Sequence, residues 1–199
     1  MLFTDLTGLL GNALALVTLA VRLPWVARFT PLQLAKLAGG VFVVSMIPVY
    51  GLSLAGFVRG IAGDLSVPTL LMLAAALVRS LSGRVLVSEL HRRELAAFVC
   101  IAAVLLYPCA LGLSPFDPYR LGFAHLWFIA GLSVLALAAF FRGYVFVASC
   151  IALAVVAWSV GWYESGNLWD HLLDPWLAIY AFAVQGRYWL ARLREKSHA

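Results

Sequence analysis

Charged residues are scarce in this sequence. Only 12% of its 199 residues are Asp, Glu, Lys or Arg, whereas soluble domains average about 25%. The hydrophobic fraction is 64% and the mean hydropathy is +0.97, and ordinary globular domains contain roughly 45–50% apolar residues. This composition argues against a soluble fold and predicts an integral membrane protein.

Cysteine is also sparse, and its placement disfavours two uses. Cys100, Cys109 and Cys150 are odd in number, lack CxxC spacing and lie in or beside apolar runs. A disulfide framework would need paired cysteines, and a zinc site would need closely spaced ligands. We therefore expect three small buried side chains, no metal site and no cofactor.

The common motifs of soluble enzymes are missing as well. We find no P-loop, GxSxG, HExxH or dinucleotide-binding fingerprint. The chain has no long linker, low-complexity tract or convincing internal repeat, so residues 1–199 are predicted to form a single polytopic domain. The net charge of +5 comes from basic residues that flank apolar segments, so we expect no nucleic-acid partner.

Long apolar runs are abundant instead. A helix needs about 20 apolar residues to cross roughly 30 Å of hydrocarbon. Seven segments approach this length and predict an all-α integral membrane protein, a compact bundle of about seven transmembrane helices. These segments are 5–21, 37–58, 67–84, 95–113, 118–141, 144–161 and 174–191. The first lacks a preceding basic region, so it is expected to be retained rather than cleaved as a signal peptide.

The basic residues predict an orientation, because Lys and Arg of short loops concentrate on the cytoplasmic side. With seven spans and an external N-terminus, twelve basic residues are cytoplasmic and only Arg59 and Arg120 are external. Without the third span, whose apolar run ends early at Arg79, the better orientation places only ten basic residues in the cytoplasm and four outside. We predict an external N-terminus and a cytoplasmic C-terminus. Twelve arginines against two lysines are typical of GC-rich bacterial genomes, so the expected location is the bacterial inner membrane.

Aspartates stand beside the helices that would run inward from the outer face. Asp5, Asp64, Asp117 and Asp174 each lie near the start of such a segment, and the last two are followed by proline. An N-cap aspartate accepts hydrogen bonds from free N–H groups, and proline favours the first helical position. Helix capping therefore accounts for these residues without a chemical function.

Other polar residues are candidates for a chemical site at the outer face. Glu164 follows the end of a predicted span, where the helix dipole disfavours a carboxylate. It is either solvated or paired with Arg120, Arg59 or a ligand. His125 is predicted seven residues inside a span, at a depth of roughly 10 Å, where ionisable groups face the bundle interior. A neutral histidine bonded to a backbone carbonyl is the alternative.

The segment 167–174 contributes the remaining candidates. Asn167 and Asp170 have the spacing of a capping box, and His171 is expected to be exposed at the membrane interface. Arg120 is either held by Asp117 three residues earlier or free to bind an anion. The candidate catalytic residues are Glu164, Asp170 and His125. The candidate substrate-binding residues are Arg120, Asp117 and His171.

Three function classes fit these observations. The first is a non-catalytic component or accessory subunit of an envelope, export or lipid-pathway system. The second is a membrane-embedded transferase or hydrolase that acts on a lipid-linked or anionic substrate at the outer face. The third is a small transporter. The expected partners are membrane lipids, with a membrane-protein partner left open. Convergence of Glu164, Asp170, Arg120 and His125 in one outward cavity would favour the enzyme, and their dispersal would favour the non-catalytic component.

Overall fold

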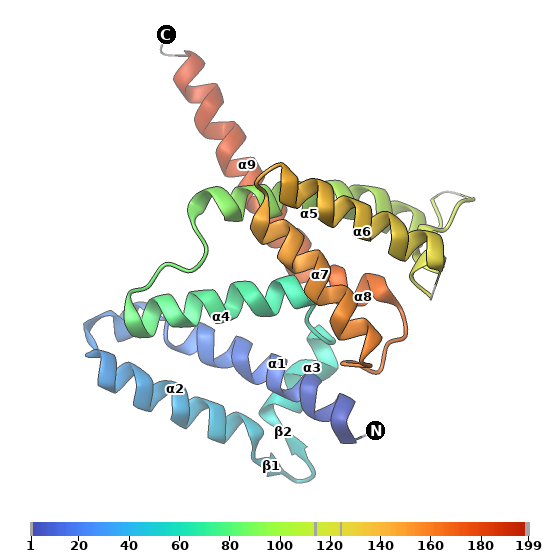
Figure 1. Cartoon of the computed structure of the whole chain (residues 1–199). Coiled ribbons are helices and arrows are strands. Elements are labelled where there is room, and N and C mark those ends of the chain that lie inside the picture. The colour runs from blue at the N-terminus through green and yellow to red at the C-terminus, as the bar shows by residue number, and fades with distance from the viewer. Residues whose placement is uncertain (1, 114, 124, 198–199) are drawn as a thin grey trace.

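The computed structural model describes residues 2–113, 115–123 and 125–197. Over these ranges the chain folds into nine α-helices, two 3-10 helices and one short hairpin (Figure 1). The α-helices are α1 (Leu2–Ala20), α2 (Pro31–Met46), α3 (Leu54–Ala62), α4 (Val67–Ser82), α5 (Glu89–Ala110), α6 (Leu126–Phe141), α7 (Val145–Ser159), α8 (Leu168–Leu172) and α9 (Pro175–Ser197). The other elements are η1 (Pro24–Arg28), η2 (Pro118–Gly122), β1 (Pro48–Val49) and β2 (Leu52–Ser53). The all-α prediction is confirmed.

The long helices alternate in direction between two ends of the molecule. In Figure 1 the chain runs back and forth through α1, α2, α4, α5, α6, α7 and α9. Packing joins α1 with α2 and α4, α6 with α7, and α5 with α9. One end, here called the acidic end, carries Asp5, Asp64, Asp117, Asp170 and Asp174. The opposite end, here called the basic end, carries Arg22, Arg28, Arg79, Arg84, Arg92, Arg93 and Arg142.

Two of the described helices are both long enough and apolar enough to cross a membrane. They cover Phe3–Ala20 and Glu89–Ala110. Four further apolar helices are shorter, namely Pro31–Met46, Val67–Ser82, Leu126–Phe141 and Val145–Ser159. At 1.5 Å per residue, a helix of 15 or 16 residues extends only about 24 Å. The fold is thus a helical bundle with two candidate spans of full length.

The predicted span 37–58 is wrong as a single helix. α2 ends at Met46, and an antiparallel hairpin pairs Pro48 with Ser53 before α3 begins. Tyr50 and Gly51 form its two-residue turn with φ values of 54° and 86°, the left-handed conformation that such hairpin turns require. Tyr50 is fully exposed at this turn.

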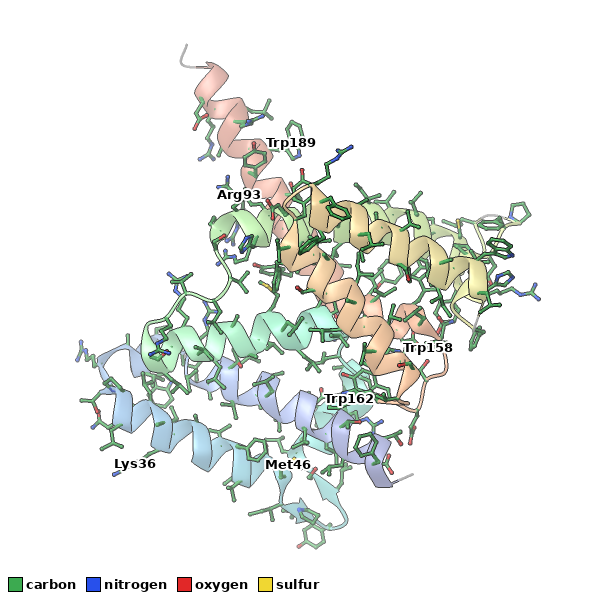
Figure 2. The ribbon with its side chains drawn as sticks, in the orientation of Figure 1. Lys36, Met46, Arg93, Trp158, Trp162 and Trp189 are labelled. Carbon is green, nitrogen blue, oxygen red and sulfur yellow. The ribbon has the colours of Figure 1, made fainter. Side chains whose placement is uncertain are left out.

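The main core lies where α5, α7 and α9 meet, with α6 and α8 packed against them. Its centre consists of small and branched residues, including Ala96, Ala103, Val147 and Ala181. Many large apolar side chains are exposed on the outside of the bundle instead (Figure 2). Among them are Leu19, Val44, Ile101, Leu137 and Phe141. Exposed apolar surface of this extent is typical of a face that contacts a membrane or another protein.

Candidate functional site

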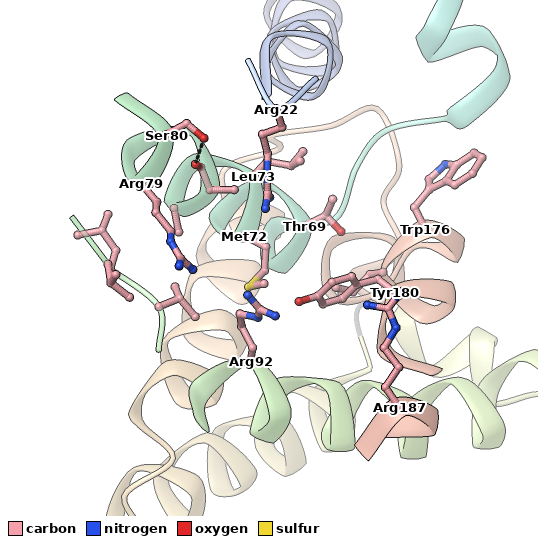
Figure 3. A pocket seen from close by; sticks show the side chains of 16 residues that line it. Arg22, Thr69, Met72, Leu73, Arg79, Ser80, Arg92, Trp176, Tyr180 and Arg187 are labelled. Atoms are coloured by element: carbon pink, nitrogen blue, oxygen red, sulfur yellow. Dashed lines mark hydrogen bonds between the residues drawn. The ribbon is translucent and has the colours of Figure 1, made fainter. Parts of the chain in front are cut away.

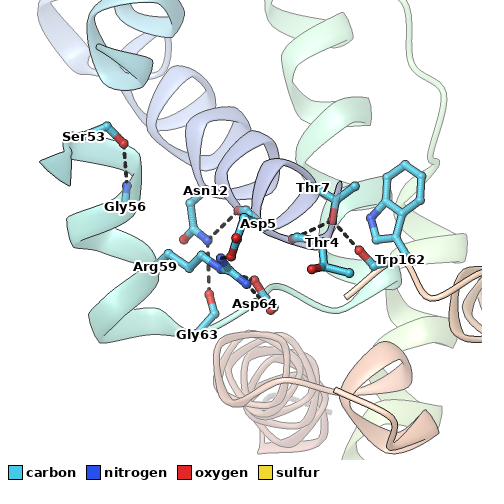
Figure 4. Close-up of polar contacts among 11 residues, drawn as sticks. Thr4, Asp5, Thr7, Asn12, Ser53, Gly56, Arg59, Gly63, Asp64 and Trp162 are labelled. Carbon is cyan, nitrogen blue, oxygen red and sulfur yellow. Dashed lines mark hydrogen bonds and ion pairs between the residues drawn. The ribbon is translucent and has the colours of Figure 1, made fainter. Parts of the chain in front are cut away.

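An arginine at the acidic end binds two of the predicted capping residues (Figure 4). Arg59 in α3 donates to both carboxylate oxygens of Asp64, at 2.6 and 3.1 Å, and to Asp5 at 3.2 Å. The hydrogen bond to Asp64 is the main cause that raises the pKa of Arg59. The capping prediction is wrong for Asp5, which lies inside α1, and for Asp64, because Ser66 holds the N-cap position of α4.

Gly8 makes room for this ion cluster against α1. A Cβ atom at Gly8 would lie 2.3 Å from Asp64 Oδ1 and 2.4 Å from Arg59 Nε. One turn further along α1, Asn12 donates to the carbonyl oxygens of Gly8 and Gly63, each at 3.1 Å. This polar contact between α1 and the end of α3 is the role expected for an isolated asparagine in a bundle.

Asp174 caps α9 as predicted and also binds α4. Its Oδ1 accepts from the Leu177 N–H at 2.8 Å. Its Oδ2 accepts from the backbone N–H of Ser66 at 2.9 Å, from the Ser66 hydroxyl at 2.6 Å and from the Thr69 hydroxyl. The carboxylate is only 3% exposed, so it joins the first turns of two helices in a buried position.

Asp170 joins α8 to η2, and the predicted capping box does not form. Asn167 does cap α8 by accepting from the Trp169 N–H at 2.9 Å. Asp170 instead accepts from the Tyr119 hydroxyl, 3.0 Å from both carboxylate oxygens, and from Ser165. Burial, and then the neighbouring Asp170, raise the pKa of Tyr119 to about 12. The Asp170 carboxylate thus holds α8 and η2 together.

The prediction that His125 lies inside a membrane helix is wrong. α6 begins at Leu126, so His125 occupies its N-cap position and is exposed. The chain before it forms η2, whose Pro118 and Tyr119 carbonyls accept from the Trp169 and Asn167 side chains at 3.0 Å. These carbonyls therefore do not serve a continuous α-helix, which places the helix start eight residues later than predicted.

His171 is buried rather than exposed, which is a second correction. Its ring is 0% exposed and lies 5.1 Å from the Tyr163 ring. Nδ1 is 3.2 Å from the Asn167 carbonyl oxygen, and Nε2 has no hydrogen-bond partner among the described residues. Burial lowers the pKa of His171, so the neutral ring is favoured. The predicted exposure of His171 is wrong because α8 packs against α7 and α4.

The six predicted site residues do not gather in one cavity. Glu164 and Arg120 are exposed, and neither forms an ion pair with a described residue. Asp117 accepts from the Tyr119 N–H at 3.0 Å and caps η2 as predicted, without binding Arg120. Of the two cavities described below, neither is lined by any of the six residues.

A larger cavity lies between α4, α5 and α9, toward the basic end (Figure 3). Its volume is about 790 Å³. Its lining contains four arginines and no acidic residue, and the arginines are Arg22, Arg79, Arg92 and Arg187. Sequence reasoning missed it by assigning all four arginines to membrane orientation. Helical spacing along α4 could have indicated this cavity. It places Thr69, Met72, Leu73, Ala76 and Arg79 on one face of the helix, and all five line the cavity.

A second cavity of about 120 Å³ lies between α5, α7 and α8. Its walls are almost wholly apolar and include Phe98, Ile151 and Trp169. It offers no charged group to a ligand, so we interpret it as imperfect packing beside the core.

Comparison of the chain with protein-family models, with curated proteins and with solved structures gives no match.

Proposed function

We propose that this chain is a small multi-pass protein of the bacterial inner membrane, with its N-terminus outside and its C-terminus in the cytoplasm. Seven helices of alternating direction support this layout, as does the apolar exterior. The helices of 15 or 16 residues are a few residues short of a full span, and local thinning of the bilayer would accommodate them. Long arginine side chains at their ends could also extend to the headgroups.

We propose further that the protein acts as a non-catalytic component of an envelope, export or lipid-pathway system. One observation carries this proposal: the five aspartates at the acidic end are engaged in structural hydrogen bonds. Asp174 and Asp170 each join two elements, and Asp5 and Asp64 share Arg59. A general acid or base must lie within hydrogen-bond reach of a substrate proton, and these groups are already occupied.

The layout can be tested by labelling single cysteines from one side of the membrane. In a background with alanine at Cys100, Cys109 and Cys150, we would introduce Tyr50→Cys at the hairpin or Arg142→Cys at the basic end. Both side chains are exposed. A membrane-impermeant maleimide should label the first variant in intact spheroplasts and the second only after lysis. Labelling of both in intact spheroplasts, or extraction of the protein by alkaline carbonate, would refute the layout.

The non-catalytic role can be tested at the candidate site residues that are exposed and whose side chains do not join two elements of the fold. Glu164→Ala and His125→Ala should each complement a deletion strain as well as the unchanged protein does. Loss of complementation with the protein level unchanged would favour the alternative, an enzyme that acts on a lipid-linked or anionic substrate at the outer face. Arg120→Ala extends the same test to the candidate anion-binding residue.

A further inference from the structure

The basic-end cavity is a wedge formed by two helices that meet at one end. α4 and α9 are joined at the acidic end by the hydrogen bonds of Asp174 to Ser66 and Thr69. Farther along they separate, and the cavity is lined by α4 from Thr69 to Ser80 and by α9 from Trp176 to Arg187. Thr69 and Arg79 are ten residues apart in one helix, which corresponds to about 15 Å of depth.

The two ends of this wedge differ in chemistry. Near the junction its walls are mainly apolar and include Met72, Leu73 and Leu177. The opposite end holds the arginines, and Figure 3 shows Arg22, Arg79 and Arg92 reaching toward the same space from three elements. The cavity therefore has the polarity of an amphiphile, apolar at its closed end and cationic at the other.

The arginines lack the partners that the acidic end provides. Arg22, Arg79 and Arg187 form no ion pair with a described residue, and Arg92 has only Glu89 of its own helix, at 3.0 Å. The Nε of Arg92 is buried and has no hydrogen-bond partner within the described residues. Converging like charges repel one another, and an unmet buried donor costs free energy. A bound anion would relieve both.

We propose that this cavity binds one anionic phospholipid-like amphiphile, with its phosphate against the arginines and an acyl chain between α4 and α9. Guanidinium groups bind phosphate through paired, charge-assisted hydrogen bonds. The cavity extends for about 15 Å along α4, from Thr69 near the acidic end to Arg79, so an acyl chain can lie along the helix with the phosphate at the basic end. The assignment to the cytoplasmic leaflet rests on the proposed topology, whereas the binding itself does not.

The proposal is tested on the full chain purified in a mild nonionic detergent. Native mass spectrometry would follow binding of dimyristoyl phosphatidylglycerol, of dimyristoyl phosphatidylcholine and of soluble glycerol 3-phosphate. We expect one phosphatidylglycerol per chain, bound about tenfold or more tightly than phosphatidylcholine, because only the former carries a net negative headgroup. Glycerol 3-phosphate should bind weakly and compete poorly, since it has no acyl chain.

Two pairs of variants assign the binding to this cavity. R79Q combined with R92Q should weaken phosphatidylglycerol binding by about tenfold or more, whereas R142Q, at an exposed arginine of the same end outside the lining, should not. Ala76→Phe fills the apolar part of the wedge and should also reduce binding. Ala152→Phe places the same ring on an exposed face of α7 and should leave binding unchanged.

Three outcomes would overturn the proposal. They are equal affinity for the two lipids, phosphatidylglycerol binding that is unchanged in R79Q/R92Q, and glycerol 3-phosphate binding as tight as that of the lipid. The last outcome would identify the ligand as a soluble phosphate. A protein that binds phosphatidylglycerol but gives the wrong cysteine-labelling pattern would refute the topology and leave the binding site standing.

Discussion

The aspartates at the acidic end of this bundle have partners, whereas most of the arginines that line the cavity at the basic end have none among the described residues. At the acidic end Asp5, Asp64, Asp170 and Asp174 all have partners, and a single arginine is shared between two of them. At the basic end three of the four arginines that line the cavity form no ion pair with a described residue. Asp174 is buried, where a charge is tolerated only when it is paired or hydrogen-bonded, and the bonds of the other aspartates join separate elements, so the first end is built for stability. At the second end, most of the arginines that line the cavity have no ion-pair partner among the described residues.

This difference shows that polar side chains connect separate elements mainly at the acidic end. The hydrogen bonds of the acidic end connect α1 with α3, α4 with α9, and α8 with η2. In the proposed membrane location they fix helices whose apolar surfaces gain little from mutual contact, because lipid tails are as apolar as the side chains they replace. At the basic end α9 is tied to α5, through Gln185 Nε2 and the Arg93 carbonyl oxygen at 2.9 Å, and no hydrogen bond between described residues joins α9 to α4 there.

Asp174→Ala should cause the largest loss of stability. It removes the acceptor for Ser66, Thr69 and the Leu177 N–H in a position that is only 3% exposed. Buried donors left without an acceptor cost about 1–3 kcal/mol each, so the unfolding free energy should fall by at least about 3 kcal/mol. Thermal unfolding in detergent, followed by circular dichroism, measures this. Asp117→Ala, which removes one bond from a short 3-10 helix, is the matched control, and an equal effect of both would contradict the prediction.

Arg59→Met should have the second largest effect. It leaves Asp5 and Asp64 facing each other without a cation, on side chains that are 47% and 21% exposed. Because both carboxylates retain some contact with water, we expect a loss of about 2 kcal/mol rather than the roughly 3–5 kcal/mol of a fully buried pair. A variant as stable as the parent at neutral pH would show that the ion cluster is dispensable.

His171 should make the acidic end sensitive to pH. Its pKa is lowered from 6.5 by burial, so the folded state takes up its proton at lower pH than the unfolded chain does. The unfolding free energy should therefore be highest above pH 6.5 and fall as the pH drops below that value. His171→Gln should flatten this dependence, whereas His125→Gln, at an exposed position, should preserve it. Unfolding temperatures measured from pH 7.5 to 5.5 would reveal the difference in slope.

Local rules predicted some of these features from the sequence and failed where distant segments decide the outcome. Asp174 and Asp117 were identified as caps because an N-cap bond joins residues two or three positions apart. The start of α6 was misplaced because η2 is held by Asn167, more than forty residues away. The buried state of His171 depends on packing between α8 and neighbouring helices, which periodicity over five residues cannot reveal.

The arginine cavity illustrates the same limit. The excess of positive charge at one end was readable from loop positions and helix order. That four of these arginines line one space depends on the angle between α4 and α9, two helices that meet through the contact of Asp174 with Ser66, far apart in the sequence. No local pattern in the sequence encodes that angle.

Arg79→Gln should have the smallest effect, and for that reason it sharpens the contrast. The side chain is exposed and forms no ion pair with a described residue, so the unfolding free energy should change by no more than about 0.5 kcal/mol. Relief of repulsion from Arg22 and Arg92 should make the change slightly stabilising at low ionic strength. Salt should abolish that gain, because the Debye length shortens to about 10 Å at 0.1 M. A destabilisation comparable to that of Arg59→Met, measured in the same detergent without added anionic lipid, would mean that the basic end is also built for stability.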